Sequence, residues 1–165
     1  MRSESDPVKT GQLPTYETIS TLAYTRQLIN ETLRYYPPLW LLARKNIEED
    51  NLNGLHVPSG SNILINLYGL HHHPSYWDNP DTFDPAHFEP TIDEKRPPYV
   101  FMPFAVAPRT CIGHNFAIME MLIVINRFAK TFDFEVPAGN IPSIEAVATL
   151  RAKGGIRLTV NKLMD

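Results

Sequence analysis

The chain has 165 residues, a formal net charge of −3 and a hydrophobic content of 43%. This length allows one domain with a sizeable core, and the composition excludes an intrinsically disordered chain. The slightly acidic balance argues against a nucleic-acid partner. No apolar run reaches the length of about 18 residues that a membrane span needs, and the single cysteine excludes an intramolecular disulfide.

The first predicted element is a helix over about residues 21–36, preceded by a linker-like or frayed segment, residues 1–20. Its apolar positions recur at helical spacing: Leu22, Ile29 and Leu33, with Leu28 beside them. Thr21 is the expected N-cap. The pair Pro37-Pro38 ends the helix, because proline disfavours helical geometry in the residue before it.

Strands and a long coil are predicted next. Residues 39–46 and 61–67 are rich in branched and apolar side chains and predict two strands. Asn53-Gly54 and residues 57–60 predict turns, so these pieces form a small antiparallel sheet. Residues 71–108 carry many prolines and aromatic side chains without a sustained period, which predicts a long ordered coil of functional importance.

The C-terminal part predicts a helix and more strands. Residues 112–130 are apolar on almost every side, so we expect a helix that is buried all round. A strand is expected at 131–136, and residues 146–151 and 156–160 predict a hairpin across Gly154-Gly155. The fold class is therefore α+β, mostly helical, with small antiparallel sheets and a long ordered coil.

Cys111 lies between this coil and the apolar helix, where the positive end of the helix favours a thiolate. Gly113 allows close approach of something flat and bulky. Arg109 can reach an acidic group on the same ligand. A haem would offer an iron, a flat face and propionates. The alternative is an inert thiol, since cysteine is among the most buried residue types.

Two further patterns allow more than one interpretation. Glu31 and Arg34 lie three residues apart on one helical face, as either a solvated surface pair or a buried pair that pins the helix to the coil ahead of Cys111. The run His71-His72-His73 is more typical of surface or turn histidines than of a zinc site, because adjacent side chains point in different directions.

Taken together, these motifs resemble the C-terminal part of the cytochrome P-450 superfamily of haem-thiolate monooxygenases. Glu31-x-x-Arg34 precedes Phe104-x-x-x-x-Arg109-x-Cys111-x-Gly113 in the family's order and spacing, and the resemblance covers about residues 11–162. Other matching segments lie between and after these motifs: Tyr36-Pro37-Pro38, Val57-Pro58-Ser59-Gly60, Trp77-x-x-Pro80-x-x-Phe83-Asp84-Pro85-x-x-Phe88, and Ala117 with Glu120.

The resemblance implies roles for individual residues. Cys111 would be the axial ligand of the iron of haem b, shielded by Phe104, with Gly113 beside it. Arg109 and Arg44 would bind the haem edge, and Glu31 and Arg34 would form a structural triad with a residue of the coil. The implied substrate wall consists of Pro38, Leu39, Leu41, Leu42, Thr149 and Leu150.

The chain also departs from the family pattern. His87 replaces the coil arginine of the triad, and a shorter, partly charged histidine predicts a weaker triad. Ala105 and Ala107 stand in the haem loop, where the family usually has glycine at the second of these positions. If position 107 requires a positive φ, alanine costs about 1 kcal/mol there. The family's oxygen-activating central helix has no counterpart, so no catalytic residue is assigned.

The implied function is a monooxygenase that inserts one oxygen atom from O2 into an apolar organic substrate. NADPH would supply electrons through a reductase docked on the Cys111 side, and a full-length parent would belong to the endoplasmic reticulum membrane. Residues 21–165 would be the haem-binding C-terminal portion of such an enzyme. The alternatives are a non-catalytic, haem-binding truncated paralogue, or an α+β structural domain with an inert cysteine.

Overall fold

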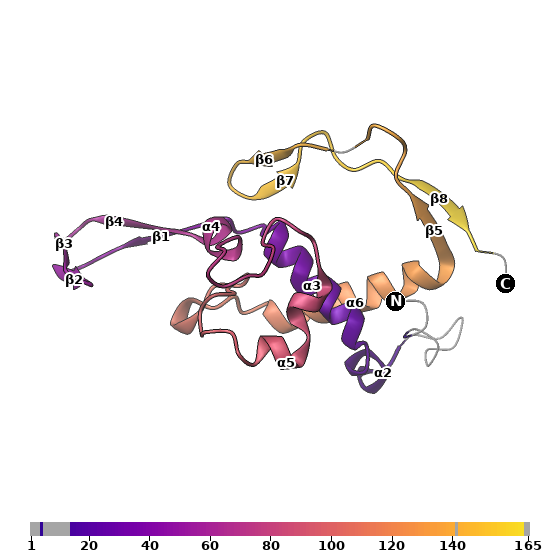
Figure 1. Cartoon of the computed structure of the whole chain (residues 1–165), viewed down its shortest axis with the longest axis horizontal. Coiled ribbons are helices and arrows are strands. Elements are labelled where there is room, and N and C mark those ends of the chain that lie inside the picture. Colours follow the sequence, from indigo (N-terminus) through magenta and orange to yellow (C-terminus); the bar gives the residue numbers. More distant parts are fainter. Residues whose placement is uncertain (1–3, 5–13, 141, 164–165) are drawn as a thin grey trace.

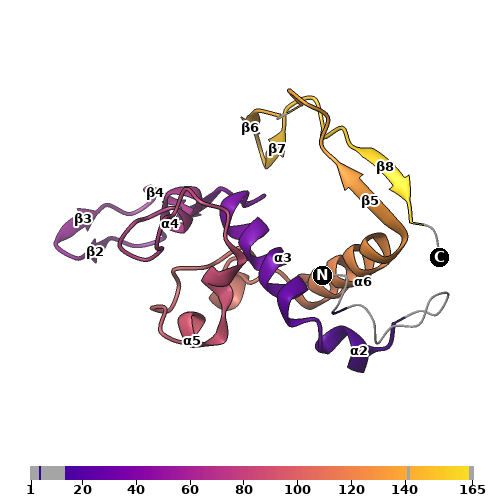
Figure 2. The ribbon, with the colours of Figure 1, turned by 45° about the vertical axis from the view of Figure 1, so that its right-hand side comes forward.

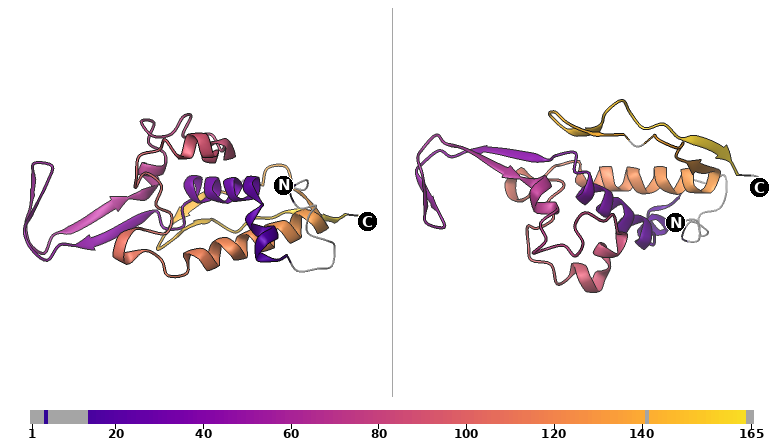
Figure 3. Two further views of the ribbon diagram at one scale, coloured as in Figure 1. Left: turned by 90° about the horizontal axis from the view of Figure 1, so that it is seen from below. Right: turned by 45° about the horizontal axis from the view of Figure 1, so that its top comes forward.

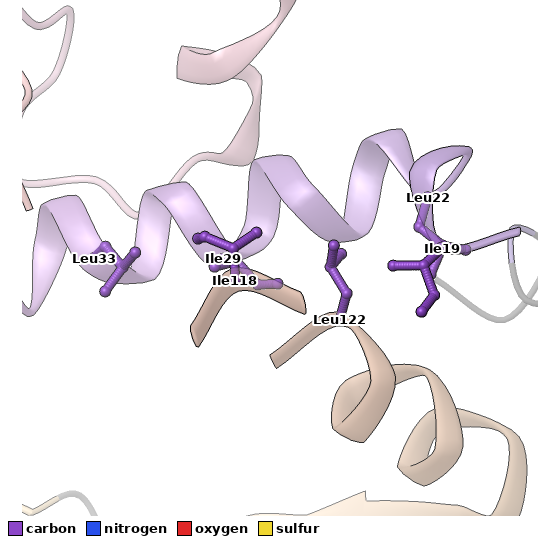
Figure 4. Packing of buried hydrophobic residues seen from close by; sticks show 6 residues of the cluster. All are labelled: Ile19, Leu22, Ile29, Leu33, Ile118 and Leu122. Atoms are coloured by element: carbon purple, nitrogen blue, oxygen red, sulfur yellow. The ribbon is translucent and has the colours of Figure 1, made fainter. Parts of the chain in front are cut away.

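Two helices, α3 (Ala23–Tyr35) and α6 (His114–Thr131), cross at the centre of the molecule (Figure 1). The computed structural model describes Glu4, residues 14–140 and residues 142–163. Side chains from α6, from α3 and from the short helix α2 (Tyr16–Ser20) and its junction with α3 form the main apolar cluster (Figure 4). Its buried members are Ile19, Leu22, Ile29, Leu33, Ile118 and Leu122.

The start of α3 differs from the sequence prediction. Thr21 is the C-cap of α2, and Leu22 occupies the N-cap position of α3 without a side-chain hydrogen bond. The carboxylate of Glu4 instead accepts the backbone N–H groups of Tyr24, at 2.6 Å, and Thr25, at 2.9 Å. An acceptor from far along the chain therefore satisfies donors that a local cap normally serves.

The segment expected to be linker-like contributes to the core at its C-terminal end. Thr15 caps α2 by accepting the N–H of Thr18, and Ile19 is 5% exposed within the main cluster. The linker-like expectation is therefore wrong for residues 16–20. Residues 1–3 and 5–13 lie outside the described residues.

The predicted strands of the first half form an arm that projects away from the helices in every view (Figures 1–3). Strand β1 (Leu41–Lys45) pairs antiparallel with β4 (Asn62–Asn66), and β2 (Asp50–Leu52) pairs with β3 (Leu55–Val57). Asn53 and Gly54 both have positive φ, as the predicted tight turn requires. The antiparallel pairing of the two predicted strands is confirmed as β1 with β4, and the sequence did not predict the second small sheet, β2 with β3.

The C-terminal strands pair differently from the prediction. Strand β6 (Ile144–Ala146) pairs with β7 (Leu150–Ala152), so the hairpin turn falls at 147–149 and not at the two glycines. Strand β5 (Phe132–Glu135) pairs with β8 (Thr159–Lys162). The predicted second hairpin strand, residues 156–160, thus overlaps β8, whose partner β5 directly follows α6. Local turn residues do not encode this long-range pairing.

The predicted long coil is present and ordered by its own apolar cluster. It begins after α4 (Leu67–His71) and contains α5 (Pro90–Asp93) and the short 3-10 turns η1 (Pro85–Phe88) and η2 (Ala107–Arg109). Trp77, Phe88 and Val100 are buried together, and Phe101 packs against both this cluster and the main one. The coil is thereby fixed against the helices.

Helix α6 is buried on one face only, which corrects the prediction of burial all round. Ile118, Leu122 and Asn126, spaced four residues apart, are its buried positions. On other faces Phe116 is 67% exposed and Phe128 is 51% exposed. Helix α6 therefore carries more apolar side chains than the other described residues bury.

Candidate functional site

A buried ion pair connects α3 to the coil. Glu31 and Arg34 are both fully buried, and the guanidinium binds the carboxylate through two hydrogen bonds, Nε–Oε2 and Nη2–Oε1, each of 2.7 Å. The surface-pair interpretation is therefore wrong. Bidentate geometry of this kind is the strongest arrangement for an arginine and a carboxylate.

The remaining donors of Arg34 reach three backbone carbonyls, one at the end of α4 and two in the coil. Nη1 donates to His71 O and Pro80 O, each at 2.8 Å, and Nη2 donates to Thr82 O at 3.0 Å. A buried ion pair needs such further partners to offset its desolvation. One guanidinium thus fixes the end of α4 and two points of the coil against α3.

His87 completes the cluster from the coil. Its Nδ1 lies 3.2 Å from Glu31 Oε1, and its Nε2 lies 2.6 Å from Asp78 O. Asp84 N–H also donates to Glu31 Oε1, at 2.8 Å. A neutral imidazole has one donor and serves one of the two acceptors, whereas an imidazolium serves both.

His71 is fully buried, which corrects the expectation of a turn or surface position for this residue, whereas His73 is exposed. Its Nε2 accepts the backbone N–H of Met102 at 3.1 Å, and its ring lies 5.3 Å from that of Phe101. Burial, followed by the nearby His72 and Arg34, lowers the pKa of His71 to about 4. His71 is therefore neutral at pH 7.

Arg96 is a second cation of the coil that the sequence did not single out. Its guanidinium lies 4.0 Å from the ring centre of Trp77 and 4.9 Å from that of Phe88. It also donates to His87 O and to the carboxylate of Asp93. Aromatic faces and carbonyls together hold this end of the coil beside the cluster.

The cysteine loop follows the coil and has an unusual backbone. Cys111 N–H donates to Phe104 O at 2.9 Å, which closes the loop, and the thiol is exposed. Ala105 and Ala107 both have φ of 58°. The left-handed conformation anticipated at 107 is therefore present, and 105 shares it, so two alanines hold a geometry that favours glycine.

The residues around Cys111 have distinct surroundings. Phe104 stacks on His114, with ring centres 4.3 Å apart, and Arg109 ends η2 in an exposed position. Gly113 is the N-cap of α6, and a Cβ there would lie 3.8 Å from Cys111 Sγ. The cysteine precedes α6 by a short turn and does not lie in its first turn, as His114 N–H donates to Cys111 O.

The segments of the predicted substrate wall meet although they are far apart in the sequence. Leu150 N–H donates to Pro38 O at 2.9 Å, and Trp40 Nε1 donates to Val147 O at 2.9 Å. Thr149 lies in the turn of the β6–β7 hairpin. Leu39, Leu41 and Leu42 lie on or beside β1, as does the half-buried Arg44, whose Nη1 donates to Ala43 O.

These residues fit an iron porphyrin. The thiol is exposed beside a glycine, so the space next to the sulfur is free of a side chain from position 113. A thiolate is a soft ligand suited to haem iron, and Arg109 offers a cation for a carboxylate. The described residues contain no cluster of three or more histidine, cysteine or acidic side chains suited to a metal ion.

Comparisons with known proteins identify the family. Residues 1–160 match the cytochrome P450 family model. This chain belongs to the cytochrome P450 family. It is 34% identical over 158 residues to cytochrome P450 132 of Mycobacterium tuberculosis, an alignment that covers 96% of this chain and 34% of the relative.

Two mouse proteins are similarly related to this P450 chain. Cytochrome P450 3A11 is 38% identical over 122 residues, which are 74% of this chain and 24% of the relative. Cytochrome P450 4X1 is 33% identical over 156 residues, covering 94% of this chain and 31% of the relative. The chain thus spans about a third or less of the length of these curated relatives.

Proposed function

We propose that this chain forms the haem-binding portion of a haem-thiolate monooxygenase, in which residues 21–165 hold haem b and Cys111 provides the axial ligand. The observation that carries the proposal is the exposed thiol at the end of a closed, left-handed loop in a member of the P450 family. When bound, the haem supplies the chemistry that inserts one oxygen atom from O2 into a substrate.

The chain's own residues would bind and orient this group. Cys111 presents its sulfur from a loop that the Cys111–Phe104 hydrogen bond closes, so little backbone freedom is left to lose on binding. Phe104 packs between the main apolar cluster and His114 and would exclude water from one side of the loop. Arg109 and Arg44 would hold the propionates.

The substrate would be an apolar organic molecule. Its proposed wall combines the strand residues Leu39, Leu41 and Leu42 with Pro38, Thr149 and Leu150. The hydrogen bonds from Leu150 to Pro38 and from Trp40 to Val147 support one continuous surface formed by these two segments. Apolar side chains with few polar groups are typical of pockets for small apolar ligands.

Electrons would come from NADPH through a reductase that docks on the Cys111 side. None of the described helices has the length and hydropathy needed to cross a membrane. A location of the full-length parent at the endoplasmic reticulum membrane is part of this proposal and follows from the family resemblance alone.

The decisive experiment is reconstitution of the chain with haem, followed by reduction and addition of carbon monoxide. We expect the red-shifted Soret band of thiolate ligation, and its loss in Cys111→Ala. Because the chain has one cysteine, the assignment is unambiguous. Cys111→His tests the ligand position by a different route, since imidazole ligation shifts the band to shorter wavelength while haem stays bound.

Ser59→Ala provides the control, because Ser59 lies in the arm and its hydroxyl donates to Ile47 O, away from the cysteine loop. This variant should keep the thiolate band. An unchanged spectrum in Cys111→Ala would falsify the ligand assignment. Absence of haem binding by the unaltered chain would contradict the proposed function as a whole.

A further inference from the structure

One buried side chain links the ion-pair cluster to the cysteine loop. Arg34 Nη1 donates to the backbone oxygen of His71, and the ring Nε2 of His71 accepts the N–H of Met102. His71 therefore joins α3 to the segment that leads into the loop. Both contacts are buried, and the His71 side chain belongs to neither of the two apolar clusters.

The contacts continue from Met102 to the cysteine. Met102 O accepts the N–H of Ala105 at 3.1 Å, which forms the turn that starts the loop. Phe104 O then accepts the N–H of Cys111 at 2.9 Å. Three successive hydrogen bonds thus lead from the His71 ring to the backbone of the residue that carries the sulfur.

Burial keeps the His71 ring neutral, and its hydrogen bond decides which ring nitrogen carries the proton. Because Nε2 accepts from Met102, a neutral ring carries its proton on Nδ1, and Nδ1 has no hydrogen-bond partner among the described residues. The protonated Nδ1 is therefore buried without a hydrogen-bond acceptor among the described residues, while Nε2 accepts the Met102 N–H. An apolar side chain of similar size would avoid this cost and would lose only the Met102 contact.

We propose that His71 is a positioning residue for Cys111, which fixes the cysteine loop by accepting the Met102 N–H. The expected effect on haem ligation by Cys111 rests on the proposed function. The expected effect on the order of the cysteine loop rests on the hydrogen bonds alone. The ring contact with Phe101 sets the orientation in which Nε2 faces Met102.

The test replaces His71 with Phe and with Gln. His71→Phe keeps a ring of similar size and removes the acceptor, whereas the side-chain oxygen of His71→Gln reaches the position of Nε2. In His71→Phe we expect hydrogen exchange at the Met102 and Cys111 amides to accelerate roughly ten- to hundredfold, because Met102 N–H loses its only described acceptor. His71→Gln should restore most of the protection.

The haem-loaded chain gives a second readout. His71→Phe should convert a substantial part of the thiolate Soret band to the shorter-wavelength band of a displaced thiolate, and His71→Gln should recover it. His56→Phe is the matched control, because His56 is an exposed residue of β3 in the arm. It should alter neither the amide exchange nor the band.

Hydrogen exchange separates failure of this inference from failure of the proposed function. If the unaltered chain binds no haem, exchange at Met102 and Cys111 in the haem-free variants still decides the role of His71. Unchanged exchange at these two amides in His71→Phe overturns the inference, even if the protein becomes less stable. Equal loss of protection in His71→Phe and His71→Gln overturns it as well.

Discussion

Charged side chains lie buried on the coil side of α3, whereas aromatic side chains lie exposed on the outer face of α6. Glu31 and Arg34 are 0% exposed, while Phe116 is 67% exposed. This reverses the usual distribution of polar and apolar residues. The two regions differ in their contacts. The charged side chains of the cluster find their hydrogen-bond partners within this chain, whereas the aromatic side chains on α6 are left largely uncovered by the described residues.

The buried cluster is specified by geometry and not by hydrophobicity. Arg34 makes two hydrogen bonds to Glu31 and three to backbone carbonyls of α4 and the coil, so each charged atom that leaves water gains a partner. On the outer face of α6, by contrast, the rings of Phe116 and Phe128 remain more than half exposed. Exposed apolar patches of this kind mark surfaces for further contacts.

The largest expected effect is the removal of one partner from the cluster. Arg34→Leu leaves the Glu31 carboxylate buried and deprives three carbonyls of their donor, so we expect a loss of about 3–5 kcal/mol in the free energy of unfolding. Urea denaturation measures it. Arg151→Leu is the control, because its pair with Glu145 is largely exposed and should contribute less than about 1 kcal/mol. Equal losses in both variants would contradict the comparison.

The next effect is a pH dependence that arises from His71. Its pKa is lowered to about 4 in the folded state, so the unfolded chain binds a proton at higher pH than the folded chain does. The contribution of His71 to the free energy of unfolding is fully present above its unfolded-state pKa of about 6.5, and it is lost as the pH falls toward 4. Between pH 7.5 and 5 we expect a loss of roughly 2 kcal/mol.

Denaturation midpoints measured across this pH range, for the unaltered chain and for His71→Gln, isolate the contribution of this residue. The variant should show a shallower decrease because it has no ring to protonate. Parallel curves for the two proteins would assign the acid sensitivity to other groups.

A smaller effect is expected at the cysteine loop, where two alanines have left-handed backbones. Ala105→Gly and Ala107→Gly should each raise the free energy of unfolding by about 1 kcal/mol, because glycine tolerates φ of 58° without steric strain. Ala117→Gly in α6 is the matched control and should lower it by about 1 kcal/mol. Thermal unfolding of the three variants measures the effect of the same Ala→Gly change, which should stabilise the protein in the loop and destabilise it in the helix.

The smallest effect on stability is expected on the outer face of α6. Phe116→Ala removes a largely exposed ring and should change the free energy of unfolding by less than about 0.5 kcal/mol. Leu122→Ala, six residues further along and 1% exposed, should cost about 3 kcal/mol. A large cost at Phe116 would mean that this face is covered in solution.

Local patterns predicted the elements whose formation depends on neighbours in the sequence. The spacing of Leu22, Ile29 and Leu33 predicted α3, and Asn53-Gly54 predicted the turn that joins β2 to β3. The residues around Cys111 and the spacing of Glu31 and Arg34 marked both as candidates, and the family resemblance assigned their roles. The left-handed backbone was anticipated at position 107. The membership of the family is confirmed, and the haem contacts stay a proposal.

Long-range contacts were beyond such patterns. The N-terminal donors of α3 are satisfied by Glu4, the strand after Gly154-Gly155 pairs with β5, and His71 binds Met102. The three histidines in a row look alike in the sequence, and only the end of α4 decides which one faces the interior. No local signal marks Arg96 as the cation that stacks on Trp77.

The sequence by itself determined the helices α3 and α6, the strand pair β1 and β4, and the residue types that are available to hold a haem, because periodicity, turn chemistry and side-chain chemistry are local properties. Only the tertiary structure decided which charges are buried and which apolar side chains remain exposed. Burial depends on what packs against a residue, and for Glu31, Arg34 and His71 those partners lie tens of residues away along the coil.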